Sequence, residues 1–387
     1  MAEAFKHLIG AHTVAEVGHH LKRVWPAFDR PAFERQALAD LDTLEFKARA
    51  VHLGNALASH LPPDFEHATA VLVASLKAVP PPAHHHDPDA ELGQLQTDAT
   101  GVAGWALWAY GDFVARHGQA HVPQALIALH AITQRFTAEF AIRPFLVNHP
   151  EAVLAVLRQW QHDPSAHVRR LVSEGSRPRL PWGLRLQALV QDPTPTLPLL
   201  RTLQDDPSEY VRRSVANHLN DIGKDHPGVL VQWLQEHLPG APITRQRLLR
   251  HASRHLIKAG HPGVLQAWGL GLGLQGHATL QAAHPQVQIG QKLPIHIRVH
   301  ASPDAPVQSL EVDYRVHHIK ADGSTSPKAF KGKRITLPPG ETVAWQKLHS
   351  FVPVSTRVLR PGLHRIDLQV NGQLVAETEV LLLDVQV

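Results

Sequence analysis

The chain has 387 residues, 43% of them hydrophobic, which is enough for two globular domains that each bury a core. Its 38 Lys and Arg against 34 Asp and Glu give a formal charge of +4, which permits a nucleic-acid partner without requiring one. The absence of cysteine excludes disulfides, thiolate chemistry and Cys-ligated zinc or iron–sulfur sites.

Residues 1–30 carry charged side chains throughout and lack the apolar segment of a signal peptide. Elsewhere, no stretch approaches the roughly 18 uninterrupted apolar residues that a membrane-spanning helix needs. We therefore expect a cytoplasmic protein with no membrane partner.

Residues 1–268 are expected to form helices, because apolar residues recur at helical spacing, as at Phe33, Ala37 and Leu41. A repeat becomes visible when DPSAHVRRLVSEG, from Asp163, is aligned with DPSEYVRRSVANHLNDIG, from Asp206, at an offset of 43 residues. That period is typical of HEAT-like helix pairs, which stack because one pair cannot bury its apolar face alone. The pattern predicts an all-α HEAT-like solenoid with a long concave surface.

Three similar segments support the pairing of helices: NHPEAVL, DHPGVL and GHPGVL begin at residues 148, 225 and 260. Each has a proline where the second helix of a pair would start, and proline is favoured in the first turn of a helix. We therefore expect each segment to open the second helix of a two-helix unit.

A proline-rich segment, PPPAHHHDP over residues 80–88, predicts an exposed loop between helices. Its residues His84, His85 and His86 with Asp87 are candidate metal ligands. Consecutive side chains in such a loop rarely converge on one ion, however. We therefore expect a surface loop and no metal.

The glycine-rich segment GLGLGLQG follows the helical region, and Gly271, Gly273 and Gly276 in it match GxGxxG. In a dinucleotide-binding loop, that motif follows a strand and opens a helix. No strand pattern precedes these glycines and no helix pattern follows them. We expect a flexible hinge over residues 269–276.

Residues 277–387 change to an alternation of apolar and polar residues in IHIRVH, LEVDYRV, HRIDLQV and QLVAETEVLLL. This period of two predicts antiparallel strands. Asn371-Gly372 lies between two such runs and predicts a two-residue hairpin, since a type I′ turn needs positive φ at both central residues. The whole chain is therefore expected to be an α + β multidomain protein, with a helical solenoid followed by an all-β sandwich.

Arginine pairs recur in the repeat: Arg169 and Arg170 are equivalent to Arg212 and Arg213. Stacked repeats would align these arginines on one face, where Arg177, Arg179 and Lys224 would extend them. Such a basic track suits contacts with successive phosphates. The alternative interpretation is ordinary solvated helix charge.

Three carboxylates, Glu139, Glu174 and Asp221, are expected near helix C-termini, where negative charge opposes the helix macrodipole. Glu174 aligns with Asn217 in the repeat, and Asp221 lies one helical turn further along the same face. Carboxylates beside cations suit cleavage of an N-glycosidic bond, because they stabilise an oxocarbenium-like sugar and orient water. Chance placement of each acid is the alternative.

Tryptophans near these acids have two interpretations. Trp182, in the segment RPRLPW, is expected either to stack on a base or sugar or to cover the edge of the solenoid. Trp105 and Trp108 lie three residues apart on a predicted helix, a spacing typical of core contacts, and we expect them to be structural.

The segments TAEFAIRPFL, VRRLVSEGSRPRLPW and YVRRSVANHLNDIGKDHP resemble the AlkC family of bacterial DNA alkylation repair proteins, over roughly residues 1–268. The resemblance implies a monofunctional DNA glycosylase that excises 3-methyladenine and 3-methylcytosine from duplex DNA without base flipping. It implies no metal and no cofactor, because a cationic base leaves as a neutral molecule. It also implies a bacterial cytoplasmic protein that acts on nucleoid DNA. We expect a monomer.

Some members of that family carry an appended immunoglobulin-like domain, which residues 277–387 resemble. A loop of this domain, for which KAFKGKR is the candidate, is expected either to contact DNA through Lys331 and Lys333 or to be a solvated lysine loop. A non-catalytic HEAT scaffold that binds DNA or protein is the alternative to the enzyme.

The resemblance assigns roles to individual residues. The catalytic carboxylates fall on Glu139, Glu174 and Asp221, and Trp182 falls at the lesion. The remaining candidates are expected to contact DNA, and they are Arg143, Arg169, Arg170, Ser173, Ser176, Arg177, Arg179, Arg212, Arg213, Asn217, Lys224, Lys331 and Lys333.

Overall fold

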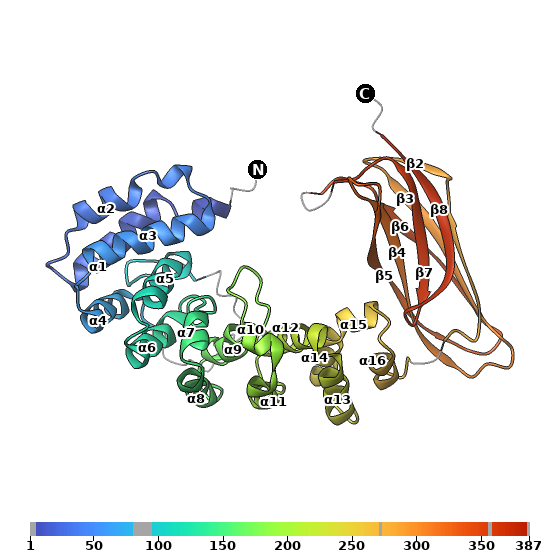
Figure 1. Ribbon diagram of the computed structural model, residues 1–387, viewed down its shortest axis with the longest axis horizontal. Helices are drawn as coiled ribbons and strands as arrows, with labels where there is room; N and C mark the ends of the chain where they lie inside the picture. Colours follow the sequence, from blue (N-terminus) through green and yellow to red (C-terminus); the bar gives the residue numbers. More distant parts are fainter. Residues whose placement is uncertain (1–4, 80–94, 271–272, 355–357, 385–387) are drawn as a thin grey trace. The chain divides into compact units, whose positions relative to one another are not determined.

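The protein is described here by a computed structural model that covers residues 5–79, 95–270, 273–354 and 358–384. The predicted loop with His84, His85 and His86, and Gly271 of the predicted hinge, lie outside the described residues. Helices occupy the chain as far as Ala267 and strands follow from Gly276, so the predicted change of fold class is confirmed (Figure 1). No described helix is both long and apolar enough to cross a membrane.

The contacts divide the chain into two compact units: residues 1–225 with 242–252, and residues 226–241 with 253–387. The helices of the first unit are α1 (Ala11–Val24), α2 (Arg30–Leu38), α3 (Phe46–His60), α4 (Phe65–Ser75), α5 (Leu107–His117), α6 (Val122–Thr133), α7 (Arg143–Asn148), α8 (Pro150–Trp160), α9 (Ala166–Gly175), α10 (Gln187–Gln191), α11 (Leu197–Leu203), α12 (Glu209–Asp225) and α14 (Ile243–Ala252). Helices α9, α12 and α14 pack side by side, and α8 and α11 pack behind them (Figure 1).

The repeat predicted at an offset of 43 residues corresponds to α9 and α12. In each copy an aspartate closes the turn before the helix: Asp163 accepts the backbone N–H of Ser165 at 2.8 Å, and Asp206 accepts that of Ser208 at 2.9 Å. The following valine is fully buried in both helices. The same local chemistry and the same buried position therefore generate equivalent helices.

The three segments that were expected to open helices do so. Pro150 begins α8, Pro227 begins α13 (Pro227–His237) and Pro262 begins α16 (Pro262–Ala267). Proline is accommodated there because the first N–H groups of a helix have no partner within it. The short helix α15 (Arg254–Lys258) completes the helical part of the second unit.

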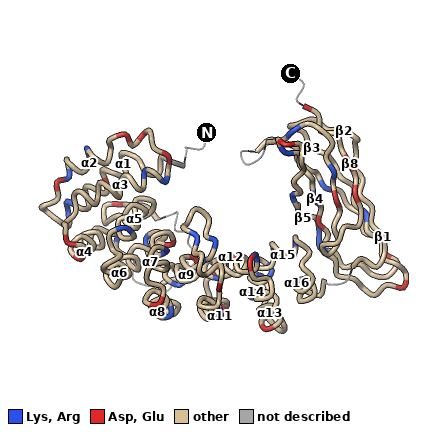
Figure 2. The backbone as a smooth tube through the Cα atoms, in the orientation of Figure 1, with Lys and Arg blue, Asp and Glu red and all other residues tan. Residues whose placement is uncertain are grey.

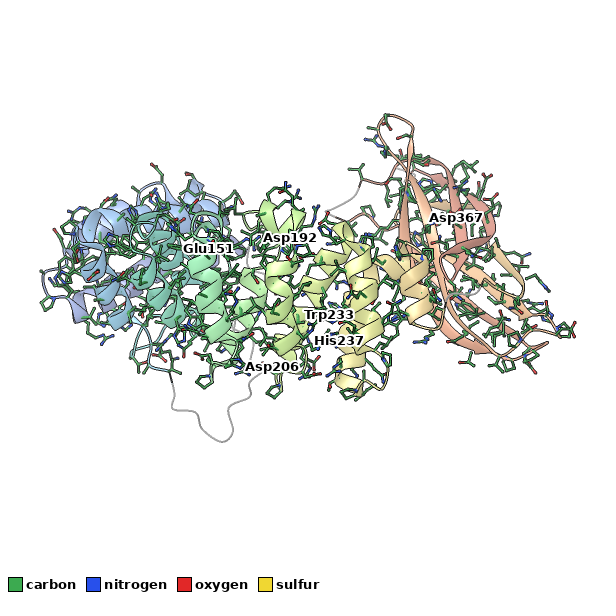
Figure 3. The ribbon with its side chains drawn as sticks, turned by 60° about the horizontal axis from the view of Figure 1, so that its bottom comes forward. Glu151, Asp192, Asp206, Trp233, His237 and Asp367 are labelled. Carbon is green, nitrogen blue, oxygen red and sulfur yellow. The ribbon has the colours of Figure 1, made fainter. Side chains whose placement is uncertain are left out.

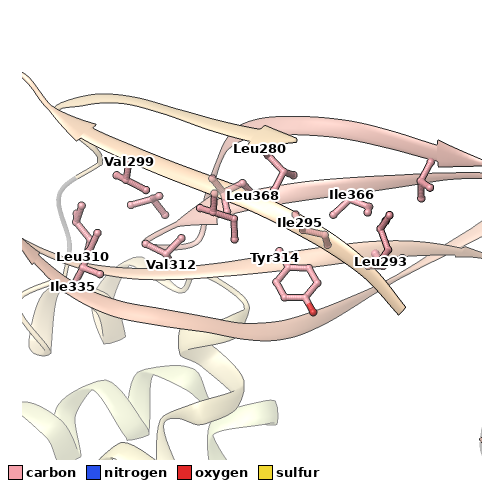
Figure 4. Close-up of a cluster of buried hydrophobic side chains, with 14 of the residues drawn as sticks. Leu280, Leu293, Ile295, Val299, Leu310, Val312, Tyr314, Ile335, Ile366 and Leu368 are labelled. Carbon is pink, nitrogen blue, oxygen red and sulfur yellow. The ribbon is translucent and has the colours of Figure 1, made fainter. Parts of the chain in front are cut away.

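The remainder of the second unit is a β-sandwich. Its strands are β1 (Gly276–Ala282), β2 (Gln286–Gln288), β3 (Lys292–Ala301), β4 (Gln308–Ile319), β5 (Thr325–Leu337), β6 (Thr342–Ser350), β7 (Gly362–Val370) and β8 (Gln373–Leu383). One sheet has the order β1-β3-β6 and the other β2-β8-β7-β4-β5. Alternate residues of each strand, such as Ile295, Tyr314 and Leu368, fill the space between the sheets (Figure 4).

The predicted hairpin turn is confirmed, because Asn371 and Gly372 connect β7 to β8 with φ of 49° and 78°. The candidate DNA-contacting loop KAFKGKR is wrong as a loop: it lies within β5, an edge strand, and its residues pair with β4. Asp313 accepts the backbone N–H of Gly332 at 2.9 Å, which holds this part of β5 in the sheet. Lys331 and Lys333 are exposed on that strand.

The turn between β7 and β8 packs closely against the turn before α16. Gly260 and Gly372 approach through their backbones, and a Cβ added at Gly372 would lie 2.1 Å from the Cα of Gly260. Both glycines are in the left-handed region, with φ of 71° at Gly260 and 78° at Gly372. The contact therefore needs glycine for space as well as for conformation.

We expect Gly372→Ala to destabilise the second unit by more than the roughly 1–2 kcal/mol that a left-handed alanine costs, because the methyl group also overlaps Gly260. Gly323→Ala is the matched control, since φ is 76° there and an added Cβ meets no described atom within 4 Å. Amide hydrogen exchange of β7 and β8 measures the difference. Equal effects of the two substitutions would contradict the role of the Gly260 contact.

Candidate active site

A cleft of about 580 Å³ opens in the first unit where α9 and α12 pack together. Its walls come from these helices, from α5 and the segment before it, and from the turns that precede α7 and follow α9. Aromatic and charged side chains dominate the lining, which includes Trp105, Trp108, Phe136, Glu139, Phe140, Arg170, Glu174, Arg177, Trp182, Tyr210, Arg213, Ser214 and Asn217.

Two arginines join the three predicted carboxylates in an alternating chain of charge. Arg170 contacts Glu139 at 2.7 Å and Glu174 at 3.8 Å. Arg177 contacts Glu174 at 2.6 Å and Asp221 at 2.8 Å. The structure thus brings Glu139, Glu174 and Asp221 into one network, which we call the acid chain. Each carboxylate in it has a cation beside it.

Glu139 lies in the turn between α6 and α7, four residues before the start of α7. The expectation that it sits near a helix C-terminus is therefore wrong, because the neighbouring helix α7 begins after it, at Arg143, with Pro144 in the first turn. The hydroxyl of Thr137 donates to the Glu139 carboxylate at 2.6 Å. Its side chain is 11% exposed and reaches the cleft.

Glu174 is the penultimate residue of α9, and its side chain is only 7% exposed. It accepts hydrogen bonds from Arg177 at 2.6 Å and from the hydroxyl of Ser214 on α12 at 2.6 Å. Burial alone would raise the pKa of Glu174, but Arg170, Arg177 and the Ser214 hydroxyl together lower it below its ordinary value. Glu174 is therefore an ionised carboxylate at the wall of a largely apolar cleft.

Asp221 is more deeply placed than the other two acids, with a side chain 1% exposed. Arg177 contacts one of its oxygens and Lys224 contacts the other at 3.0 Å. Asp221 thus lies behind Arg177 and fixes the guanidinium that holds Glu174. Its position suits orientation of the chain more than direct contact with a ligand.

His218 supports the site from inside α12 and is fully buried. Its Nδ1 lies 2.9 Å from the backbone carbonyl of Ser173, so that nitrogen carries the proton and donates. Burial lowers the pKa of His218 to about 3, and the imidazole is therefore neutral in the folded protein.

We expect the first unit to lose stability as the pH falls below about 6.5, because the unfolded chain then protonates His218 while the folded chain does not. One such proton accounts for up to about 1.4 kcal/mol per pH unit. Urea unfolding monitored by the helical circular dichroism signal, between about pH 7 and pH 5, measures the slope. His218→Gln keeps a donor for the Ser173 carbonyl, and its slope should be smaller; identical slopes would contradict the assignment.

The two arginines of each repeat have different roles. Arg169 donates to both carboxylate oxygens of Asp206, at 2.6 and 3.0 Å (Asp206 is labelled in Figure 3). Arg212 donates to the backbone carbonyl of Pro207 at 2.8 Å. Both therefore brace the turn before α12. Only the second member of each pair, Arg170 or Arg213, lines the cleft.

The basic track predicted from the repeat is thus largely neutralised. Arg169 and Arg170 are held by carboxylates, and Arg179 donates to both oxygens of Asp225, each at 2.6 Å. Positive and negative residues are interspersed along the helices instead of forming separate blocks (Figure 2). Arg213 differs, because its side chain is 63% exposed and its contact with Glu209 is long, at 3.5 Å.

Three of the predicted DNA contacts are buried and do not reach the surface of the described protein. Arg143, Ser173 and Ser176 have no exposed area, so we assign them a supporting role in place of the expected contact. Arg143 donates to the carbonyls of Gly175 and Leu184 and so ties both ends of the turn that carries Trp182. Burial lowers the pKa of Arg143 to about 10.

Trp182 projects from that turn and is 70% exposed, yet it lines the cleft. Its φ of 63° is in the left-handed region, which is unfavourable for a large side chain. Strain of this kind persists where the surrounding structure imposes it and often marks functional sites. Its position is consistent with a ligand contact and differs from a plug at the solenoid edge.

Sequence reasoning missed the aromatic wall of the cleft. Trp105 and Trp108, which we expected to be structural, both pack on Phe46 and also line the cleft, where they are half-buried. Trp108 stacks on Phe140 with ring centroids 5.0 Å apart. Tyr210 lies on the other side, with the Arg170 guanidinium 4.9 Å from its ring centroid. The spacing of two tryptophans on a helix does not distinguish a core from a cleft wall.

Comparison with known proteins identifies the relatives of this chain. Residues 276–384 match the family model "Uncharacterised protein YhaZ, C-terminal Ig-like domain". The chain is 32% identical to the uncharacterized protein YhaZ of Bacillus subtilis (strain 168), over 95% of this chain and 96% of that protein. Its structure resembles Pseudomonas fluorescens alkylpurine DNA glycosylase AlkC bound to DNA containing an abasic site analog, with a TM-score of 0.85 and 30% identity. That likeness covers 98% of this chain and 100% of the AlkC chain.

The chain belongs to the AlkC family. The resemblance carried by three short segments therefore extends over both units of the chain. The immunoglobulin-like character of the strands is also confirmed by the family model. In this AlkC-family protein, the acid chain and the aromatic wall of the cleft are the two features on which a proposed function is based.

Removal of Arg177 should strongly destabilise the AlkC-family fold. Arg177→Met leaves Glu174 and Asp221 without their shared cation, and breaking a buried ion pair costs about 3–5 kcal/mol. Arg179→Met, which breaks a more exposed pair with Asp225, should cost no more than about 1 kcal/mol. Urea unfolding of both variants provides the comparison, and a similar loss in the two would refute the importance of the acid chain.

Proposed function

We propose that this protein is a DNA glycosylase that hydrolyses the N-glycosidic bond of alkylated bases in duplex DNA. The observation that carries the proposal is the acid chain, which keeps two carboxylates, Glu139 and Glu174, at the wall of a cleft lined by aromatic rings. The full-length likeness to an alkylpurine DNA glycosylase supports the same reaction.

The chemistry of the bond explains why carboxylates are useful in this cleft. Loss of the base leaves an oxocarbenium-like deoxyribose whose positive charge an adjacent anion stabilises. Glu174 is ionised there, since its arginine and serine partners lower its pKa. The Glu174 side chain is only 7% exposed, so little solvent screens its field.

We assign the substrates as bases that carry a positive charge, 3-methyladenine and 3-methylcytosine. Such a base leaves as a neutral molecule, so the reaction needs no strong general acid and, in this proposal, no metal or cofactor. Among the described residues, no group of three or more His, Asp or Glu is arranged to hold a metal ion. The aromatic wall suits a cationic or sugar-bearing ligand, because ring faces attract positive charge.

The three acids then have separate roles. Glu139 and Glu174 line the cleft, and we assign to them stabilisation of the sugar and orientation of the attacking water. The sequence predicts a catalytic role for Asp221 as well, but its side chain is 1% exposed. We therefore propose that Asp221 is a positioning residue that acts through Arg177.

We further propose that the deoxyribose reaches the acids while the base stays in the DNA stack. Trp182, exposed beside the acid chain, would then pack on the lesion nucleotide from outside. Bending of the duplex exposes a sugar without extrusion of its base. In this proposal the protein acts as a monomer on chromosomal DNA in the bacterial cytoplasm.

The decisive experiment measures release of free base from duplex DNA that contains one 3-methyladenine or one 3-methylcytosine. We expect the wild-type protein to release the base and leave an alkali-labile site. Glu174→Gln should slow release by about 100-fold or more, since one preorganised electrostatic group is commonly worth that factor. Affinity for a duplex with an abasic-site analogue should stay nearly unchanged.

Glu151→Gln is the matched control, because Glu151 is an exposed acid on α8 that does not line the cleft (Figure 3). It should release base at the wild-type rate. A folded wild-type protein that binds DNA but releases neither base would favour the non-catalytic scaffold and refute the glycosylase.

A further inference from the structure

A second groove, of about 230 Å³, lies between α12 and α14 in the same unit as the cleft. Glu209 and Arg213 line both the cleft and this groove, so the two are neighbours with a common wall. The other side of the groove is formed by Thr244, Arg247 and His251 of α14. None of these three residues is used by the proposed reaction.

Helix α14 continues the register of α9 and α12, although its sequence lacks the DPS turn. Two residues after Arg170, Arg213 and Arg247, each helix has a fully buried aliphatic residue: Val172, Val215 and Leu249. Arg170, Arg213 and Arg247 therefore hold equivalent positions on three successive helices.

The residue four positions after each arginine also forms a row, because residues i and i+4 share one face of a helix. These residues are Glu174, Asn217 and His251. Two of these residues are in contact, since His251 Nε2 lies 3.0 Å from Asn217 Oδ1. Glu174 is joined to α12 through a different residue, Ser214, which donates to it at 2.6 Å. Asn217 lines the cleft, and His251 lines the groove.

Charge changes along the arginine row. Arg170 is largely shielded, with a side chain 17% exposed, and it is paired with Glu139 and Glu174, so its charge is neutralised within the acid chain. Arg213 pairs only at 3.5 Å with Glu209, and their side chains are 63% and 65% exposed, so the pair contributes little. Arg247 is exposed. Arg212, Arg213 and Arg247 thus face a single carboxylate across the groove, which favours an anion.

We propose that the groove between α12 and α14 binds backbone phosphates of the DNA strand that enters the cleft, with Arg213 and Arg247 contacting neighbouring phosphates. His251 holds Asn217 at the border between the two sites. The inference rests on the proposed function, because it takes DNA as the ligand. A strand fixed at phosphates on this side of the acid chain presents its deoxyribose to Glu174 in a defined position.

The first test measures the affinity of the full-length protein for a duplex with an abasic-site analogue over a range of salt concentrations. Arg247→Gln should reduce the slope of log K against log salt by about one, as loss of a single phosphate contact requires. Arg245→Gln is the matched control on the same helix, since Arg245 is bound by Asp205 and does not line the groove. Its slope should equal that of the wild type.

The second test finds which phosphate is bound. A set of duplexes carries one uncharged methylphosphonate at successive positions on either side of the abasic-site analogue. We expect the wild-type protein to bind more weakly when the methylphosphonate is at one or two of these positions. At one of them, Arg247→Gln should bind the substituted and unsubstituted duplexes equally, because both changes remove the same contact. Thermal unfolding of the variant verifies that it is folded.

The outcomes separate this inference from the proposed function. In one outcome the wild-type protein releases methylated bases, but Arg247→Gln leaves the salt slope unchanged and its effect adds fully to that of each methylphosphonate. This result would refute phosphate binding in the groove and leave the proposed glycosylase activity intact. In the other outcome the wild-type protein releases no base, but Arg247→Gln lowers the salt slope and is not additive with one methylphosphonate. This result would refute the glycosylase activity and support phosphate binding in the groove.

Discussion

The alternation of carboxylates and guanidinium groups in the acid chain is the interaction on which the site depends. Taking a carboxylate out of water costs several kcal/mol, and neighbouring carboxylates repel one another unless cations lie between them. Arg170 and Arg177 offset both costs and leave Glu174 ionised. Without these two arginines, the same acids would have to be protonated or exposed to water.

The acid chain also constrains how the helices stack. Arg170 and Glu174 come from α9, Asp221 and Ser214 from α12, and Arg177 from the turn that follows α9. A slip of one helical turn, about 5.4 Å, between α9 and α12 would separate Ser214 from Glu174 and Asp221 from Arg177. The stacking register of α9 and α12 therefore also determines whether the acids keep their partners and stay ionised. The buried valines of the repeat help to fix that register.

The sequence predicts the repeated helices well, because the features that generate them are local. The DPS turn, the proline at a helix start and the Asn-Gly hairpin each act within a few residues. Side-chain partners are a different matter. Arg169 and Arg170 are adjacent in sequence, but successive residues of a helix point about 100° apart, so one braces a turn and the other reaches the cleft. The sequence did not reveal α14 as a third copy of the repeat. Arg247 does not follow Arg213 at the 43-residue offset, and the turn before α14 lacks the aspartate of the DPS motif.

Other residues show the same limit. Glu139 was expected near a helix C-terminus, but it precedes α7, which begins at Arg143 and has Pro144 in its first turn. Trp105 and Trp108 have the spacing of core residues, and only the stacking of distant helices decides that a cleft lies beside them. The buried positions of Arg143, Ser173 and Ser176 likewise depend on the turn that folds over them.

The division into compact units does not follow the change from helices to strands. Helices α13, α15 and α16 belong with the strands, whereas α14, which lies between them in sequence, belongs with the acid chain. The chain therefore passes from one unit to the other three times, and no single cut separates them. A fragment that ends at the glycine-rich segment would keep α16 but lose the hairpin turn that packs on Gly260. Such interleaving makes the two units difficult to exchange by simple gene fusion, so they are expected to be inherited together.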